Sequence, residues 1–269
     1  MGAALKDVVL CIHSFASSSR QYRSLAARLA PRFHVIAADL YGHGERAAWS
    51  GGRPLSLADE AAFLEALLPG KGPVHLVGHS YGAAVALHIA RAHRSRILSM
   101  ALYEPTMWGT LAALCKGEPA TLEIEGVRDD TNRLLEAGEV EAAAERFVDY
   151  WAGPGAWHAT PAERRPRLLA SVRALPDGWA AAFGEPWSAA HLQSLDVRCL
   201  LMTGSRSTAA ARRALRLLRE TLPHADLMEF EGLGHLGPVT HTTRVDEVVE
   251  AFISERSQPW VHSQPLHTA

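Results

Sequence analysis

The chain has 269 residues, of which 48% are hydrophobic and 21% are charged, and its formal net charge is −2. This length fits one large domain or a domain with an insertion, and the apolar fraction is sufficient for a sizeable core, which excludes a mainly disordered chain. Because 27 Lys and Arg residues are balanced by 29 Asp and Glu residues, a basic nucleic-acid-binding surface is not expected. No segment stays apolar over the ~18 residues of a membrane-spanning helix, so none is predicted.

The three cysteines, Cys11, Cys115 and Cys199, include no C-x-x-C pair, so a disulfide or zinc framework is not expected and a reducing cytoplasm is the predicted location. Residues 1–10 contain no basic region leading into a long apolar segment, and no export signal is predicted. We expect no metal and no cofactor, because no spacing of histidines and carboxylates matches a metal-binding helix.

Six short apolar runs have the composition of buried strands, and most are separated by amphipathic segments. Ser56 and Asp59 form a capping-box pattern at the start of one of these segments. This alternation predicts an α/β fold with a mostly parallel sheet flanked by helices. In chain order the predicted elements are strand 8–12, helix 20–29, strand 33–40, helix 56–68, strand 74–77, helix 83–94, strand 97–103, strand 197–202, helix 208–222, strand 227–230 and helix 243–255.

The alternation is interrupted over residues 106–194, where the pattern is helical and contains no convincing strand. We interpret this stretch as a helical lid inserted into a core formed by residues 1–105 and 195–257, with a loose tail at 258–269. Five of the seven tryptophans of the chain lie in the predicted lid: Trp108, Trp151, Trp157, Trp179 and Trp187.

The strongest chemical signal is a G-x-S-x-G pattern, Gly78 to Gly82, between a predicted strand and a predicted helix. A serine on a very tight strand-to-helix turn presents its hydroxyl group clear of the backbone, and glycines on both sides allow the backbone segments to approach closely. The following helix directs its N-terminus at the site and favours negative charge there. We predict that Ser80 is a nucleophile; the alternative is a glycine turn whose serine only caps the helix.

Four blocks of this sequence stand in a characteristic order and spacing: His13-Ser14-Phe15, Asp39 to Gly44, Gly78 to Gly82, and Gly234-His235. In these blocks the chain resembles the α/β-hydrolase fold superfamily, and the resemblance extends over nearly the whole chain. Members normally begin with extra antiparallel strands. Since only seven residues precede Val8, we expect those strands to be reduced or missing here.

A serine hydroxyl needs a base to accept its proton. The resemblance implies a histidine on the loop after the last strand, and His235 matches that position. His241 is the alternative, although a loop or helix-capping role suits it better. His79 is expected to pack beside the site, and His13 to be a structural loop residue.

The third member of the implied triad is a carboxylate that orients the imidazole. Its usual place in the superfamily follows the penultimate strand, but residues 203–219 contain no Asp or Glu. Some branches place the acid after the preceding strand, which here ends at Glu104, and we predict that Glu104 is the acid, held extended by Pro105. The alternatives are a hinge residue paired with an arginine, and a carboxylate-free arrangement in which Ser207 contacts His235.

The resemblance also implies that the backbone N–H groups of Phe15 and Tyr81 form an oxyanion hole. Asp39 is expected to be a structural loop residue. The aromatic residues of the predicted lid favour an apolar pocket above Ser80, although a helical layer also needs bulky residues to pack on the core. The side chains expected to line this pocket are His79, Trp108, Trp151 and Trp187.

The implied activity is that of a serine hydrolase that cleaves carboxylic esters or thioesters of a modestly hydrophobic small molecule through an acyl-enzyme. Acyl transfer to an alcohol or peroxide and hydrolysis of a carbon–carbon bond are alternatives on the same triad, and a non-catalytic binding protein is the alternative from another class. Dehalogenase and epoxide-hydrolase chemistry is not favoured, because Ser80 occupies the position where those enzymes use an aspartate.

Overall fold

Six strands form one sheet in the computed structural model, which describes residues 6–255. The strand order is β2-β1-β3-β4-β5-β6, and every neighbouring pair is parallel. The prediction of a mostly parallel sheet is therefore confirmed, while the predicted tail at 258–269 lies outside the described residues. The strands are β1 (Val8–Ile12), β2 (His34–Ala38), β3 (Val74–His79), β4 (Ile97–Tyr103), β5 (Cys199–Gly204) and β6 (Ala225–Phe230).

Helices cover both faces of the sheet, because alternate side chains of the strands point to opposite faces and both sets are apolar. On one face pack α1 (Arg23–Leu29), after the 3-10 turn η1 (Ser19–Tyr22), and α13 (Thr242–Ser254). On the other face pack α2 (Leu57–Glu65), α3 (Tyr81–Ala92) and α11 (Ala209–Thr221). Two short elements, η2 (Arg94–Arg96) and α12 (Gly237–Thr240), lie in connections.

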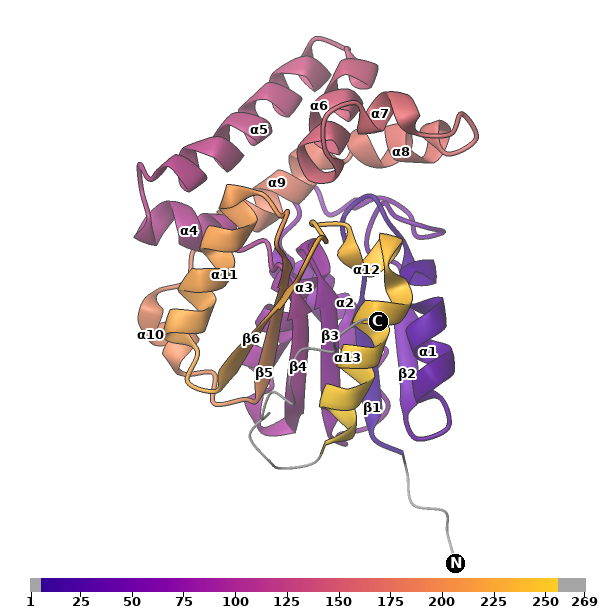
Figure 1. Ribbon diagram of the computed structural model, residues 1–269, viewed down its shortest axis with the longest axis vertical. Helices are drawn as coiled ribbons and strands as arrows, with labels where there is room; N and C mark the ends of the chain where they lie inside the picture. Colours follow the sequence, from indigo (N-terminus) through magenta and orange to yellow (C-terminus); the bar gives the residue numbers. More distant parts are fainter. Residues whose placement is uncertain (1–5, 256–269) are drawn as a thin grey trace, which may run out of the picture.

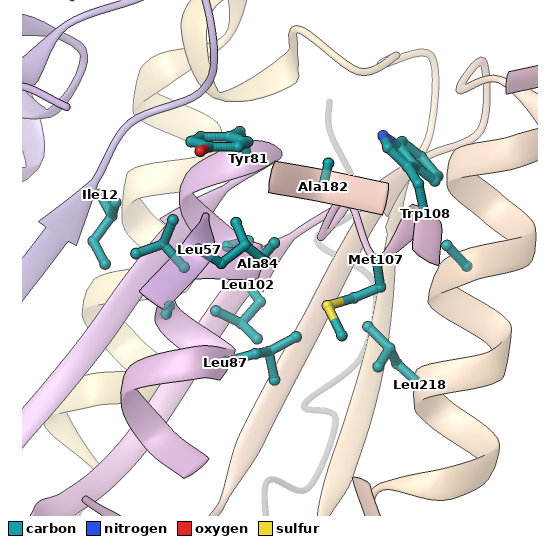
Figure 2. Packing of buried hydrophobic residues seen from close by; sticks show 14 of the residues in the cluster. Ile12, Leu57, Tyr81, Ala84, Leu87, Leu102, Met107, Trp108, Ala182 and Leu218 are labelled. Atoms are coloured by element: carbon teal, nitrogen blue, oxygen red, sulfur yellow. The ribbon is translucent and has the colours of Figure 1, made fainter. Parts of the chain in front are cut away.

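The chain between β4 and β5 contains helices α4 to α10. Figure 1 shows α5 to α8 beyond the end of the sheet that lies opposite the N-terminus. Figure 2 shows Trp108 of α4 and Ala182 of α9 in one cluster with Leu102 of β4, so this helical segment shares the core of the sheet. Its helices are α4 (Trp108–Leu114), α5 (Pro119–Glu136), α6 (Val140–Ala152), α7 (Ala156–Ala159), α8 (Arg165–Val172), α9 (Leu175–Gly184) and α10 (Ala189–Gln193).

The predicted boundaries on both sides of Ser80 are wrong. The pattern places the end of the third strand at Val77 and the start of the helix at Ala83, whereas β3 continues to His79 and α3 begins at Tyr81. Ser80 alone therefore connects the strand to the helix. The capping box at α2 is present as predicted, with the Ser56 side chain accepting from the Asp59 N–H and the Asp59 carboxylate accepting from the Ser56 N–H.

None of the helices within residues 6–255 combines the length and apolar character needed to cross a membrane.

A carboxyl group on α2 is buried inside the fold. Glu60 of α2 is fully buried; its Oε2 accepts a hydrogen bond from the Tyr41 N–H at 3.3 Å, and its Oε1 has no partner in the described part of the chain. Burial raises the pKa of Glu60 to about 8, against the opposing effects of the Tyr41 amide and the Arg46 charge. The folded protein therefore keeps this carboxyl protonated at neutral pH.

Glu60→Gln is expected to raise the free energy of unfolding at pH 8 and to change it little at pH 4.5. The unfolded carboxyl releases its proton near pH 4.5 and the folded one near pH 8, so the wild type loses about 1.4 kcal/mol of stability for each pH unit between these values. Urea unfolding at pH 4.5, 6 and 8 measures this, with the exposed Glu136→Gln as control. A difference between variant and wild type that does not change with pH would contradict the assignment.

Candidate active site

Ser80 has a backbone conformation that residues with a side chain rarely adopt, with φ +56° and ψ −119°. Its N–H donates to the Tyr103 carbonyl at 2.8 Å, and its own carbonyl accepts from the Thr106 N–H at 3.3 Å. These hydrogen bonds to the end of β4 and the residues after it hold the strained turn in place and set the position of the hydroxyl group.

The two glycines of the motif are required by close backbone contacts. A Cβ atom on Gly78 would lie 2.5 Å from the Cα of Ala83, and one on Gly82 would lie 2.2 Å from the carbonyl oxygen of Ile12. Both distances are shorter than non-bonded carbon contacts allow. The turn therefore packs against the first turn of α3 on one side and against the end of β1 on the other.

Three of the predicted site residues meet at this turn. His235 Nε2 lies 3.0 Å from Ser80 Oγ, and His235 Nδ1 lies 2.6 Å from Glu104 Oε2. The side chains of Glu104 and His235 are 0% and 4% exposed. Because an ionised carboxylate can only accept, Nδ1 carries the proton donated to Glu104, and Nε2 is free to accept the proton of the Ser80 hydroxyl. This is the geometry of a nucleophile, a base and an orienting acid.

Glu104 is held by groups at the end of β5 and just after it. Its Oε1 accepts hydrogen bonds from Thr203 Oγ1 at 2.6 Å, from the Gly204 N–H at 3.2 Å and from Ser207 Oγ. Burial acts to raise the pKa of Glu104, but the hydrogen bond and charge of His235, with the two hydroxyl donors, hold it below its ordinary value. Ser207 therefore contacts the carboxylate and not the imidazole, and among the described residues Glu104 forms no ion pair with an arginine.

The expectation that Pro105 holds Glu104 extended is wrong. Glu104 has φ +47°, in the left-handed region. Its N–H donates to the Met202 carbonyl at 3.0 Å, and two residues later the Thr106 N–H donates to Ser80. These contacts between segments turn the chain sharply at the end of β4, and they outweigh the local preference that a following proline imposes.

The loop that carries His235 packs against the ends of β4 and β5. The Tyr103 hydroxyl donates to the Gly234 carbonyl at 2.8 Å. A Cβ atom on Gly204 would lie 2.1 Å from the carbonyl oxygen of Leu233, so glycine is needed where β5 ends. The backbone on the N-terminal side of His235 is thus fixed by the same strands that present Glu104.

A chain of polar side chains joins the loop after β1 to His235. His79 Nε2–H donates to the carbonyl of His235 at 2.9 Å, and His79 Nδ1 accepts from Gln21 Nε2 at 3.2 Å. Gln21 Oε1 in turn accepts from the N–H and the hydroxyl of Ser14. Burial, followed by the charge of His235, lowers the pKa of His79 to about 3, so its ring is neutral. Gln21 carries no motif that could have identified it in the sequence.

The two predicted oxyanion-hole residues lie beside Ser80. Phe15 and Tyr81 line the same cavity as Ser80, and their rings pack edge to face with centroids 5.8 Å apart. Within residues 6–255 neither backbone N–H donates a hydrogen bond. Ala16, which follows Phe15, has φ +57°, so the loop turns sharply next to the site. Both N–H groups are therefore available as donors.

The other polar candidates lie away from the reacting groups. The exposed His241 contacts Thr240 Oγ1 at 2.9 Å. His13 connects two loops, because its Nε2 accepts from the Leu40 N–H while its Nδ1–H donates to a neighbouring carbonyl. Asp39 accepts from the Ser19 N–H at 2.7 Å and from a second loop amide.

Ser80 and His235 lie on the wall of a cavity of about 700 Å³. Trp108 and Trp151 line it as predicted, and Phe147 and Trp179, which were not in the predicted set, line it as well. The expectation that His79 and Trp187 line the pocket is wrong. His79 is buried behind His235, as described above. The Trp187 ring is buried against α3, with the Arg91 guanidinium 4.8 Å from its centroid.

Trp151 of α6 stacks on the imidazole of His235. The ring centroids are 4.0 Å apart and the planes are inclined by 28°. Trp108 stacks behind Trp151 at 6.2 Å. One face of the histidine ring is therefore covered by the helical segment between β4 and β5.

The fold and these residues place the chain among known proteins. A family model described as alpha/beta hydrolase family matches residues 9–251, so the chain belongs to this family. The chain is 30% identical over 241 residues to a pimeloyl-[acyl-carrier protein] methyl ester esterase of Chromobacterium violaceum, covering 87% of this chain and 89% of that protein. It is 33% identical over 150 residues to the lipase LipV of Mycobacterium tuberculosis, covering 54% of this chain and about half, 51%, of the lipase.

Solved structures show the same fold. The alpha/beta hydrolase MGS-M2 from a deep-sea metagenome library superposes with a TM-score of 0.77 at 16% identity, covering 97% of this chain and 94% of that one. At this identity the similarity establishes the fold and nothing finer.

Glu104→Gln is expected to lower kcat by about a thousandfold to ten thousandfold, because the neutral amide neither stabilises an imidazolium nor selects the tautomer that accepts the Ser80 proton. Ser207→Ala removes one of the three donors to Glu104 Oε1 and should lower kcat by about tenfold. Steady-state kinetics on an activated ester measure both effects, with the exposed Ser50→Ala as control. Near-normal kcat in Glu104→Gln would refute the assignment of the acid.

Proposed function

We propose that this protein is a serine hydrolase that cleaves carboxylic esters or thioesters of a modestly hydrophobic small molecule through an acyl-enzyme. The observation that carries the proposal is the 3.0 Å contact of Ser80 Oγ with His235 Nε2 on the wall of an apolar cavity. The relatives named as an esterase and a lipase support the same class of reaction.

In the proposed mechanism His235 accepts the Ser80 proton as the oxygen attacks the substrate carbonyl. The N–H groups of Phe15 and Tyr81 hold the oxyanion, and Glu104 stabilises the imidazolium that forms. His235 then gives the proton to the leaving alcohol or thiol. A water molecule, deprotonated by the same ring, releases the acid and restores Ser80.

We further propose that helices α4 to α10 act as the lid of this site. Trp151 covers His235, and α9 approaches the loop after β1 so closely that a Cβ atom on Gly178 would lie 2.4 Å from the Phe15 ring. The segment therefore contacts both the base and the oxyanion loop. In this role it shapes the acyl site and limits the access of water.

Ser80→Ala is expected to abolish turnover of a chain-length panel of activated esters, because the alanine side chain cannot form the acyl-enzyme. Ser17→Ala is the matched control, since Ser17 lines the same cavity without contacting His235, and it should keep near-wild-type kcat. Mass spectrometry of the wild type should detect an acyl group on Ser80. Activity that survives in Ser80→Ala would overturn the mechanism, and absence of turnover in the wild type would favour a binding protein. Adding an alcohol and analysing the products separates hydrolysis from acyl transfer.

Trp151→Leu is expected to lower kcat by about tenfold, while Trp151→Phe keeps most of the activity. An aromatic face over the imidazolium contributes about 0.5–2 kcal/mol, and leucine offers volume without that face. Kinetics on the same ester measure the difference, with thermal unfolding to verify that both variants fold. Equal losses in the two variants would show that Trp151 acts only by filling space.

A further inference from the structure

Two arginines of the helical segment line the cavity at its exposed side. Arg164 and Arg167 both contribute to the cavity wall, and both side chains are exposed to solvent. They therefore lie at the mouth of a cavity whose inner wall carries Ser80 and His235. Between these two ends the wall is mainly apolar and aromatic.

Most other arginines of this segment have a partner. Arg128, Arg133 and Arg146 pair with Asp129 or Asp130. Arg165, which lies between the two cavity arginines, donates to two backbone carbonyls and stacks on Trp157. In contrast, the side chains of Arg164 and Arg167 form no ion pair or hydrogen bond with any residue in the range 6–255. Their guanidinium groups are thus free to bind a ligand.

Helix geometry directs both arginines to the same place. Arg164 is the N-cap of α8, and Arg167 and Leu168 follow it by three and four residues, the spacing of one helical face. All three line the cavity. On this face Leu168 contributes an apolar contact, and the two arginines place their charged groups in water. Arginine commonly lies in this way at the edge of an apolar surface.

We infer that the substrate carries an anionic group, a carboxylate or a phosphate, at the end remote from its ester, and that Arg164 and Arg167 bind this group. The inference rests on the proposed ester hydrolysis and names its substrate class. Guanidinium groups suit planar or tetrahedral oxyanions, which they bind through paired N–H donors. Glu163 also lines the mouth, so one carboxylate opposes the two cations and weakens the binding of an anion.

The test compares pairs of esters that are identical except at one end, which carries either a carboxylate or its neutral methyl ester. In one series this end belongs to the acyl part of the substrate, and in the other series it belongs to the alcohol part. The double variant Arg164→Gln with Arg167→Gln should raise KM for the charged ester by about tenfold in at least one series. It should leave kcat for the charged ester, and both kcat and KM for the neutral ester, unchanged. Arg173→Gln is the matched control, because Arg173 is exposed at the end of the same helix but does not line the cavity. Glu163→Gln should lower KM for the charged ester, and lysine at both positions should keep most of the preference.

Binding is measured separately from turnover in the Ser80→Ala variant, by calorimetry with the same esters and with analogues that end in phosphate. Tighter binding of the charged ligands, lost in the double glutamine variant, supports the anion site even if the ester chemistry is wrong. A preference for the phosphate analogue would assign that group as the natural anion. Equal affinity for charged and neutral ligands in both series, or equal losses with Arg173→Gln, would overturn the inference.

Discussion

The buried hydrogen bond between His235 and Glu104 connects parts of the chain that lie far apart in sequence. The donor, His235 Nδ1 on the loop after β6, lies 2.6 Å from the acceptor, Glu104 Oε2 at the end of β4. A carboxylate with so little exposure is stable only when its charge is compensated by several donors. Thr203, Gly204 and Ser207 supply those donors from the end of β5. Three neighbouring strands therefore have to end at the same edge of the sheet before this site can form.

In the proposed triad the acid follows β4 and not β5, and a residue after β5 supports it. Where the resemblance implies a carboxylate, the chain has Ser205, Arg206, Ser207 and Thr208, and the Ser207 hydroxyl donates to Glu104 at the end of the adjacent strand. Ser207 and Glu104 are therefore in contact although they belong to different segments of the chain. The carboxylate thus follows β4 and not β5, but its Oε2 still lies 2.6 Å from His235 Nδ1, which suits the role of the acid in the proposed triad.

The helical segment between β4 and β5 contacts both the cavity and the proposed catalytic residues. Trp151 stacks on His235, and Gly178 permits α9 to approach Phe15. The same segment carries Arg164 and Arg167 at the cavity mouth. A change in how these helices pack on the sheet would therefore alter the cavity, His235 and the loop that carries Phe15 together. Under the proposed function, this arrangement couples recognition of a substrate to the position of His235.

The sequence by itself predicted the parallel α/β fold, the tight turn at Ser80 and the placement of His235 and Glu104 beside it, because apolar runs, glycine spacing and short motif blocks can be read along the chain. It did not determine the left-handed conformation of Glu104, the link through Gln21, or which aromatic residues line the cavity. Those depend on contacts between segments that are distant in the chain. Trp151 and Trp187 lie in the same aromatic-rich segment, but packing turns one toward His235 and the other toward α3, and no local pattern distinguishes them.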